Sequence, residues 1–77
     1  MKPKIGMYIL VIDDISMPSN SRTIGKITRF SYNSIWMNVI RWGDGMSTKV
    51  DNEYYVNMDK DTYIVANTLD ELFIELL

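Results

Sequence analysis

Two side chains that enzymes often use as nucleophile, base or metal ligand are missing from this chain of 77 residues. The sequence contains no cysteine and no histidine. That composition excludes disulfides, zinc sites with Cys or His ligands, and the usual pairing of a nucleophile with an imidazole base. The serines fall in expected loops or at a strand edge, and none has a candidate base beside it. We therefore expect no catalytic residue, no metal site and no cofactor.

Two pairs of carboxylates are the remaining candidates for chemistry, because two acids suffice for glycoside hydrolysis. Asp13 and Asp14 are adjacent, and Asp59 and Asp61 are separated by one residue. A domain this small offers little room for a substrate cleft, so we expect these to be solvated loop acids. Asp59-x-Asp61 also begins like a calcium-binding loop, but the later positions lack the oxygen ligand, glycine and glutamate that such a loop requires.

Aromatic side chains are more numerous than the core of so small a domain can hold. The two tryptophans, five tyrosines and two phenylalanines compete for a core with room for about four or five rings, since each ring buries about 150–250 Å². The rings expected in the core are Phe30, Trp42, Tyr63 and Phe73. Trp and Tyr are enriched at binding hot spots, so other aromatics and nearby methionines predict a partner-binding surface, or else only cover the rim of the core. The predicted partner-binding residues are Tyr32, Trp36, Met37, Tyr54, Tyr55 and Met58.

Charge is distributed unevenly along the chain, whose net charge is -2. Residues 1–30 carry five basic and two acidic side chains, whereas residues 31–77 carry three basic and eight acidic ones. This asymmetry is either chance or two faces of opposite sign that would orient a partner. There is no global basic field to attract nucleic acid. Local contacts with nucleic acid would use Lys26, Arg29 and Arg41, with an aromatic ring stacking on bases.

No segment predicts insertion into a membrane. A bilayer span needs ~20 consecutive apolar residues, and no stretch approaches that length. Lys2 and Lys4 precede a short apolar run, as in the first half of a signal peptide. The run ends at Asp13 and Asp14 without a small-residue cleavage site. We expect a cytoplasmic protein.

The predicted elements begin with two strands. Met7–Ile12 is a continuous apolar run whose length fits a strand buried on both faces better than a helix. A polar loop follows, and Thr23–Phe30 is the second strand. A β-bulge near Gly25 would place the two isoleucines and the phenylalanine of this strand on one inward face.

Ile35–Trp42 is the predicted third strand, joined to the second by a tight turn. Strict alternation places Trp36 and Trp42 on the same face, with Trp42 as the core anchor and Trp36 as the contact residue. Gly43-Asp44-Gly45 is a hairpin signal because its glycines tolerate positive φ. It leads into a fourth strand, Met46–Asp51, whose alternation is typical of an edge.

The end of the chain predicts a last strand and a helix. Glu53–Val56 either extends the fourth strand or begins a short strand of its own, and Tyr63–Ala66 is the last strand. Thr68 and Glu71 match a capping box at the start of a helix over about residues 68–77. Apolar residues recur along this helix at intervals of three and four, which gives it one apolar stripe.

The stretch Ile24-Gly25-Lys26-Ile27, together with Val39-Ile40-Arg41-Trp42-Gly43-Asp44-Gly45, resembles paired strands of small barrels of the Tudor and KOW type. Those families carry a glycine-basic-aliphatic second strand and a basic-tryptophan-turn third strand. With the element order above, the resemblance implies a single domain over residues 1–77. Its fold would be mainly β, a five-stranded antiparallel SH3-like barrel with a short C-terminal α-helix. A KOW-type barrel would also imply contact with RNA or the ribosome.

We predict a non-catalytic protein-binding module. Its partner would dock on the aromatic patch or add a strand to the edge from Met46 to Val50. A compact, cysteine-free chain rich in Ile, Asn, Asp and Lys is similar in style to bacteriophage accessory proteins. That similarity implies a protein that inhibits or redirects one host protein of defence or transcription in the host cytoplasm. Two alternatives stay open: a nucleic-acid-binding KOW-like barrel, and a structural subunit. The subunit would form a homo-oligomer through the edge strand or the C-terminal helix, where Ile74 and Leu77 lie off the apolar stripe.

Overall fold

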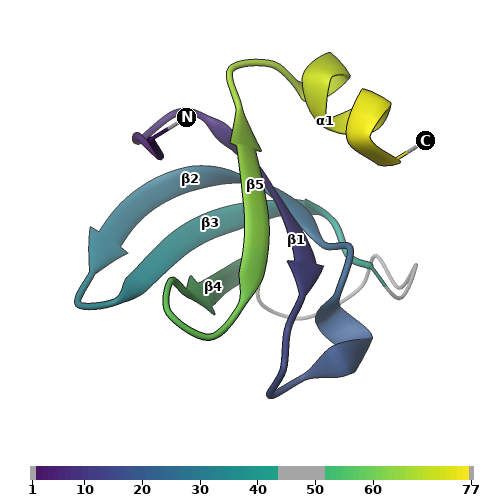
Figure 1. Ribbon diagram of the computed structural model, residues 1–77. Coiled ribbons are helices and arrows are strands. Elements are labelled where there is room, and N and C mark those ends of the chain that lie inside the picture. The colour runs from purple at the N-terminus through teal and green to yellow at the C-terminus, as the bar shows by residue number, and fades with distance from the viewer. Residues whose placement is uncertain (1, 44–51, 77) are drawn as a thin grey trace.

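The computed structural model describes residues 2–43 and 52–76 and is mainly β, with one α-helix after the last strand (Figure 1). The strands are β1 (Tyr8–Asp13), β2 (Ile24–Ser31), β3 (Ser34–Arg41), β4 (Glu53–Asn57) and β5 (Thr62–Ala66). A 3-10 helix, η1 (Pro18–Asn20), lies in the loop after β1, and the C-terminal helix is α1 (Leu69–Leu76). The predicted first, second, third and last strands are confirmed, with each end shifted by at most one residue.

The five strands form one antiparallel sheet in the order β4-β3-β2-β1-β5. The sheet curves strongly, most visibly along β2 and β3 (Figure 1). It is not closed, because no ladder joins its two end strands, β4 and β5, among the described residues. The mainly β prediction with five antiparallel strands and a C-terminal helix is therefore confirmed, and a closed barrel is not.

The strand that pairs with β3 on its outer side is β4, from Glu53 to Asn57. Both alternatives predicted Glu53–Val56 to be a strand, and this is confirmed. The predicted fourth strand, Met46–Asp51, and most of the predicted Gly-Asp-Gly turn fall on residues 44–51, outside the described residues.

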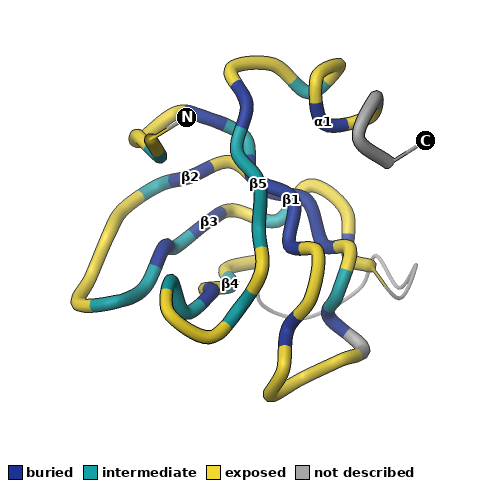
Figure 2. Tube along the Cα trace, in the orientation of Figure 1, coloured by how far each residue is buried: buried dark blue, intermediate teal, exposed yellow. Residues whose placement is uncertain are grey.

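β1 is buried on both faces of the sheet, and it separates two apolar clusters (Figure 2). Ile9 and Val11 belong to the larger cluster, on what we call the inner face. Leu10 points to the opposite or outer face, where it packs with Ile24 and with Leu72 of α1. Full burial of an aliphatic side chain stabilises a fold by about 1.5–3 kcal/mol, so both faces of this strand contribute. The continuous apolar run is confirmed as a strand buried on both faces.

The β2–β3 ladder contains an extra residue, Thr28, in β2. Ile27 lies opposite Met37, but the next pair is Arg29 opposite Trp36. Side chains alternate with a period of two, so one extra residue reverses which face each later side chain of β2 occupies.

The prediction of one inward face for β2 is wrong, because β2 has no extra residue between Ile24 and Ile27 and these side chains therefore alternate onto opposite faces. Ile24 lies in the outer cluster, whereas Ile27 lies in the inner cluster. Beyond the bulge, Phe30 lies opposite Ile35, a residue of the inner cluster, but it is 40% exposed at the end of the sheet.

A second irregularity separates the two tryptophans. Ile24 lies opposite Arg41 and Gly25 opposite Val39, so Ile40 is an extra residue in β3. The bulge expected near Gly25 is thus present, but the extra residue is on the partner strand. The prediction that Trp36 and Trp42 share a face is wrong for this reason. Trp42 packs on Tyr54 at the inner cluster with a ring separation of 5.5 Å, and Trp36 lies on the outer face.

Gly25 marks a close approach between β2 and β3. A Cβ atom there would lie 2.6 Å from the Met37 sulfur and 2.8 Å from the Asn38 carbonyl oxygen. Both distances are well inside van der Waals contact, and the carbonyl belongs to the backbone and cannot swing away. The side chain of Met37 therefore occupies the space that a larger residue at Gly25 would need.

α1 closes the outer cluster over β1 and β5. The Thr68 hydroxyl accepts a hydrogen bond from the Glu71 amide at 3.4 Å, which is one half of the predicted capping box. Leu72 is fully buried against the sheet, and Leu69 packs at the margin of the same cluster. Within the described residues, no helix has both the length and the apolar character needed to cross a bilayer.

Of the four aromatic residues expected in the core, two are buried or half-buried and two are exposed. Trp42 is 6% exposed, and Tyr63 packs against the inner cluster as a half-buried residue. Phe30 and Phe73 are 40% and 43% exposed, so their predicted burial is wrong. Aliphatic side chains fill most of the core in their place, because β1, β2 and β3 supply enough of them from both faces.

Substitution at neighbouring helix positions tests how α1 is docked. Leu72→Ala should lower the free energy of unfolding by about 2–5 kcal/mol, because it leaves a cavity under the helix. Phe73→Ala, the matched control on the exposed side, should lower it by less than about 1 kcal/mol. Urea denaturation followed by tryptophan fluorescence measures both. Equal losses for the two variants would show that the helix faces the sheet differently.

Candidate binding surface

α1 covers only part of the outer face, and the part on β2, β3 and β4 carries a group of polar and aromatic side chains. We call this group the Trp36 face. Its members are Lys26, Arg29, Trp36, Asn38, Glu53 and Tyr55. They are brought together by the ladders, since Lys26, Asn38 and Glu53 are direct cross-strand neighbours, and so are the other three.

Arg29, Trp36 and Tyr55 form a row across the three strands. The guanidinium carbon of Arg29 lies 3.9 Å from the centroid of the Trp36 ring. On the other side, the Trp36 and Tyr55 rings are 4.8 Å apart and tilted by 34°. Cation–π contacts at exposed sites contribute about 0.5–1 kcal/mol, and aromatic pairs about 0.5–1.5 kcal/mol. Trp36 is thus held between a cation and a second ring.

Polar contacts fix Trp36 and Arg29 of the same row. The indole Nε1 of Trp36 donates to the Ser31 hydroxyl at 2.8 Å. Arg29 Nη2 donates to Glu53 Oε1 at 2.9 Å, which forms an ion pair that spans from β2 to β4. The Arg29 and Glu53 side chains are 54% and 39% exposed, so this pair adds little to stability. Its effect is to hold the guanidinium in one orientation over Trp36.

A second cation lies next to the row. Lys26 lies opposite Tyr8 of β1, with its ammonium nitrogen 5.7 Å from the centroid of the tyrosine ring. Lys26 and Arg29 are three residues apart, a spacing that normally places side chains on opposite faces of a strand. The extra Thr28 brings them to the same face.

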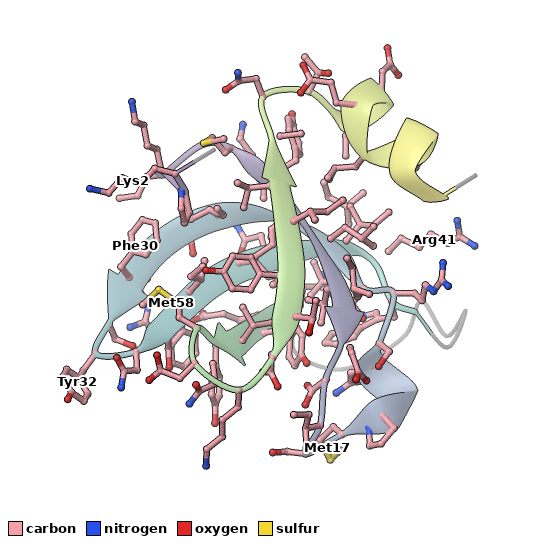
Figure 3. All side chains as sticks on the ribbon, in the orientation of Figure 1. Lys2, Met17, Phe30, Tyr32, Arg41 and Met58 are labelled. Carbon is pink, nitrogen blue, oxygen red and sulfur yellow. The ribbon has the colours of Figure 1, made fainter. Side chains whose placement is uncertain are left out.

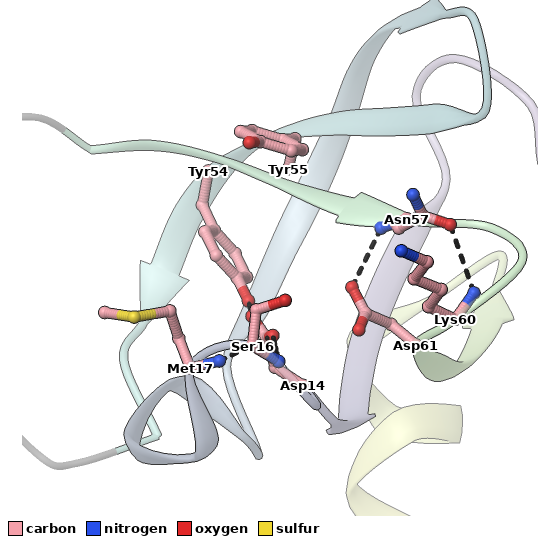
Figure 4. Close-up of a pocket in the computed structure, with 8 residues that line it drawn as sticks. All are labelled: Asp14, Ser16, Met17, Tyr54, Tyr55, Asn57, Lys60 and Asp61. Atoms are coloured by element: carbon pink, nitrogen blue, oxygen red, sulfur yellow. Dashed lines mark hydrogen bonds between the residues drawn. The ribbon is translucent and has the colours of Figure 1, made fainter.

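A pocket of about 270 Å³ lies beside the Trp36 face and contains two of the candidate acids (Figure 4). Its lining residues are Asp14, Ser16, Met17, Tyr54, Tyr55, Asn57, Lys60 and Asp61. Asp14 is only 4% exposed, so the expectation of a solvated loop acid is wrong for this residue. Residues from the loop after β1, from β4 and from the β4–β5 turn therefore meet here.

The carboxylate of Asp14 organises the loop that follows β1. Its Oδ1 accepts hydrogen bonds from the amides of Ser16 at 3.1 Å and Met17 at 3.0 Å. Its Oδ2 accepts the hydroxyl proton of Tyr54. The acid thus turns the chain into η1 and ties this loop to β4. Charged hydrogen bonds of this kind contribute about 1.5–3 kcal/mol.

Asp61 has a similar structural role in the β4–β5 turn. Its Oδ2 accepts the Asn57 amide at 2.8 Å, and its Oδ1 accepts the Ile15 amide at 3.3 Å. The Asn57 side chain accepts the amide of Lys60 (Figure 4) and also that of Asp59, as in an Asx turn. Asp61 thus accepts backbone amides from the loop after β1 and from the end of β4, whereas Asp14 accepts two amides of its own loop and the Tyr54 hydroxyl. No group of three or more His, Cys, Asp or Glu side chains in the described ranges could hold a metal ion.

The predicted partner-binding residues occupy different environments. Trp36 and Tyr55 lie together on the Trp36 face, and Tyr55 is 52% exposed. Tyr32 is 93% exposed and projects from the β2–β3 turn (Figure 3). Tyr54 and Met58 are half-buried against the inner cluster.

Met37 is fully buried, so its expected exposure is wrong. It points inward because it precedes the bulge in β3 and lies opposite Ile27. Among the predicted nucleic-acid contacts, Lys26 and Arg29 belong to the Trp36 face. Arg41 lies at the opposite end of β3 from the β2–β3 turn (Figure 3).

Two residues of the Trp36 face, Asn38 and Glu53, were not identified from the sequence. Asn38 shares the parity of Trp36 on β3, so alternation could have identified it. Glu53 could not be found this way, because its position depends on the register of β4. Comparisons with protein-family models, curated proteins and solved structures found no match to this chain. The chemistry of the Trp36 face therefore carries the functional inference.

Removal of a single hydroxyl tests the junction between the β1 loop and β4. Tyr54→Phe should lower the free energy of unfolding by about 1–3 kcal/mol, because the buried carboxylate of Asp14 loses a donor. Tyr55→Phe is the matched control and should change it by less than about 0.5 kcal/mol. In an Asp14→Ala background, the effect of Tyr54→Phe should nearly vanish. Chemical denaturation measures the wild type and all four variants, and additive losses for Asp14→Ala and Tyr54→Phe would contradict the contact.

Proposed function

We propose that this protein is a non-catalytic binding module that docks another protein on the Trp36 face. The observation that carries the proposal is the row formed by the exposed Arg29, the half-buried Trp36 and the exposed Tyr55. Trp, Tyr and Arg are the residue types most enriched at interface hot spots, because they bury large areas for few rotatable bonds.

The row is ordered before any partner arrives. Trp36 is fixed by the Ser31 hydroxyl and by two stacked neighbours, and Arg29 is fixed by Glu53. Ordering a flexible side chain at an interface costs about 0.5–1.5 kcal/mol. Most of that cost is already met in the folded chain, which supports recognition by a rigid face.

The arrangement of the rings favours a protein partner over nucleic acid. Base stacking needs a free ring face, but Trp36 has Arg29 on one side and Tyr55 on the other. Glu53 also offsets the charge of Arg29, and the chain as a whole carries a net charge of -2. Nucleic acid is the second candidate, because Lys26 and Arg29 share this face with the half-exposed Tyr55.

Two predictions from the sequence, the barrel type and the bacteriophage origin, extend this proposal. In an SH3-like barrel of Tudor or KOW type, the Trp36 face would be the outer surface of the β2–β3–β4 half. A bacteriophage accessory protein would use that surface to bind one host protein in the host cytoplasm. Both statements stay predictions, and identification of the partner tests the second.

Two substitutions on the face should weaken partner binding. Trp36→Ala and Tyr55→Ala should each raise the Kd by about thirtyfold, which corresponds to about 2 kcal/mol at a hot spot. Phe30→Ala, an aromatic of similar exposure on the inner face, is the matched control and should leave the Kd unchanged. Affinity capture from bacterial lysate identifies the partner, and calorimetry with the purified partner measures the affinities.

Salt distinguishes the two candidate partners. Binding to nucleic acid should fall steeply as salt increases, because phosphate contacts release counterions. Binding to a protein through this aromatic row should change little. A partner whose affinity is unaffected by both face substitutions would refute the proposal.

A further inference from the structure

β5 is an edge strand without the usual protection against pairing. In the part of the chain that the structure describes, its ladder partner is β1 alone. Residues Thr62–Ala66 include no charged residue and no proline. Edge strands normally carry such residues, because their unpaired backbone groups are a template for another strand.

A groove of about 250 Å³ shows that this edge is open beside α1. Its lining residues are Ile64, Val65, Ala66, Glu71 and Leu72. Consecutive side chains of a strand point to opposite faces, so a groove that touches three in a row runs along the strand edge. Glu71, which is exposed in the first turn of α1, is the charged residue of this groove.

The opposite charge lies at the other end of β5 on the same outer face. A second groove, of about 130 Å³, is lined by Leu10, Ile12, Arg22 and Ile64. Leu10 lies opposite Ile64 in the β1–β5 ladder, and Ile12 is 40% exposed. Arg22 lies across β1 from β5, where its amide donates to the Val11 carbonyl, and its groove reaches Ile64 of β5. The acidic Glu71 lies beside the end of β5.

We propose that β5 pairs antiparallel with β5 of a second copy of this chain. A two-fold axis near Ile64 would place Thr62 of one copy opposite Ala66 of the other. Antiparallel pairing brings the start of one strand to the end of the other, so Arg22 of each copy approaches Glu71 of its partner. The two contacts are equivalent by symmetry, as an isologous interface requires.

The charge and composition of β5 and its neighbours favour a second copy of this chain as the pairing partner. A neutral strand meets itself without repulsion, and Arg22 and Glu71 approach each other only in the antiparallel arrangement. The two acids at the start of β5 have partners within their own copy: Asp13, opposite Thr62, accepts from the Ser21 hydroxyl, and Asp61 accepts the Ile15 and Asn57 amides. The exposed Ile12 and the half-buried Ile64 add apolar area at the same face. This interface uses a different surface from the Trp36 face, so it stands or falls independently of the proposed function.

Sedimentation velocity on the full chain tests the dimer across a range of concentrations. The wild type should pass from monomer to dimer as concentration increases. Arg22→Glu and Glu71→Arg should each raise the dimer Kd by about tenfold or more, because both symmetric contacts become repulsive. The double variant should restore dimerisation. Arg41→Glu makes the same change of charge on β3 and should have no effect.

Hydrogen exchange separates the modes of association, and circular dichroism confirms the fold of each variant. Amides of β5 should exchange more slowly at high concentration, whereas amides of β4 should not change. A chain that is monomeric at every concentration would overturn the proposal, as would pairing with a strand of another protein in its place. A dimer that survives both single substitutions, or that the double variant does not restore, would also overturn it.

Discussion

Thr28 is the extra residue in the β2–β3 ladder, and the two faces of this sheet depend on it. Without it, β2 would continue its alternation and place Arg29 on the inner face with Ile27. The bulge instead turns Arg29 outward, beside Trp36, and leaves the inner cluster wholly apolar on this side. One inserted residue therefore keeps a cation out of the core and completes the row on the Trp36 face.

The outer face is divided between a covered and an uncovered part. α1 buries Leu72 against β1 and β5, which leaves β2, β3 and β4 free to present the Trp36 face. The helix also forms one wall of the groove along the edge of β5. Two different surfaces result, one an ordered row of side chains and the other an open backbone edge. The first suits recognition of a folded partner, and the second suits addition of a strand.

The buried acid of the pocket illustrates how a small chain without disulfides holds its loops. Asp14 caps the turn into η1 and binds Tyr54, which lies 40 residues further along the chain. Asp61 likewise joins the loop after β1 to the β4–β5 turn, because it accepts the amides of Ile15 and Asn57. Each of these acids belongs to a different candidate carboxylate pair of the sequence, but both anchor loops in space, because backbone amides and the Tyr54 hydroxyl are their donors.

Local patterns in the sequence determined the elements of this protein: the apolar run of β1, the strands of the β2–β3 hairpin, and the capped helix. They also indicated that aromatic residues exceed the capacity of the core, which is the basis for predicting Trp36 and Tyr55 as contact residues. Only the tertiary structure decided which face each side chain occupies. A bulge shifts parity without changing hydrophobicity, so burial of Met37 and separation of Trp36 from Trp42 cannot be read from alternation. Burial of Asp14 was equally hidden, because its partner Tyr54 is distant in sequence and is brought near by the curvature of the sheet.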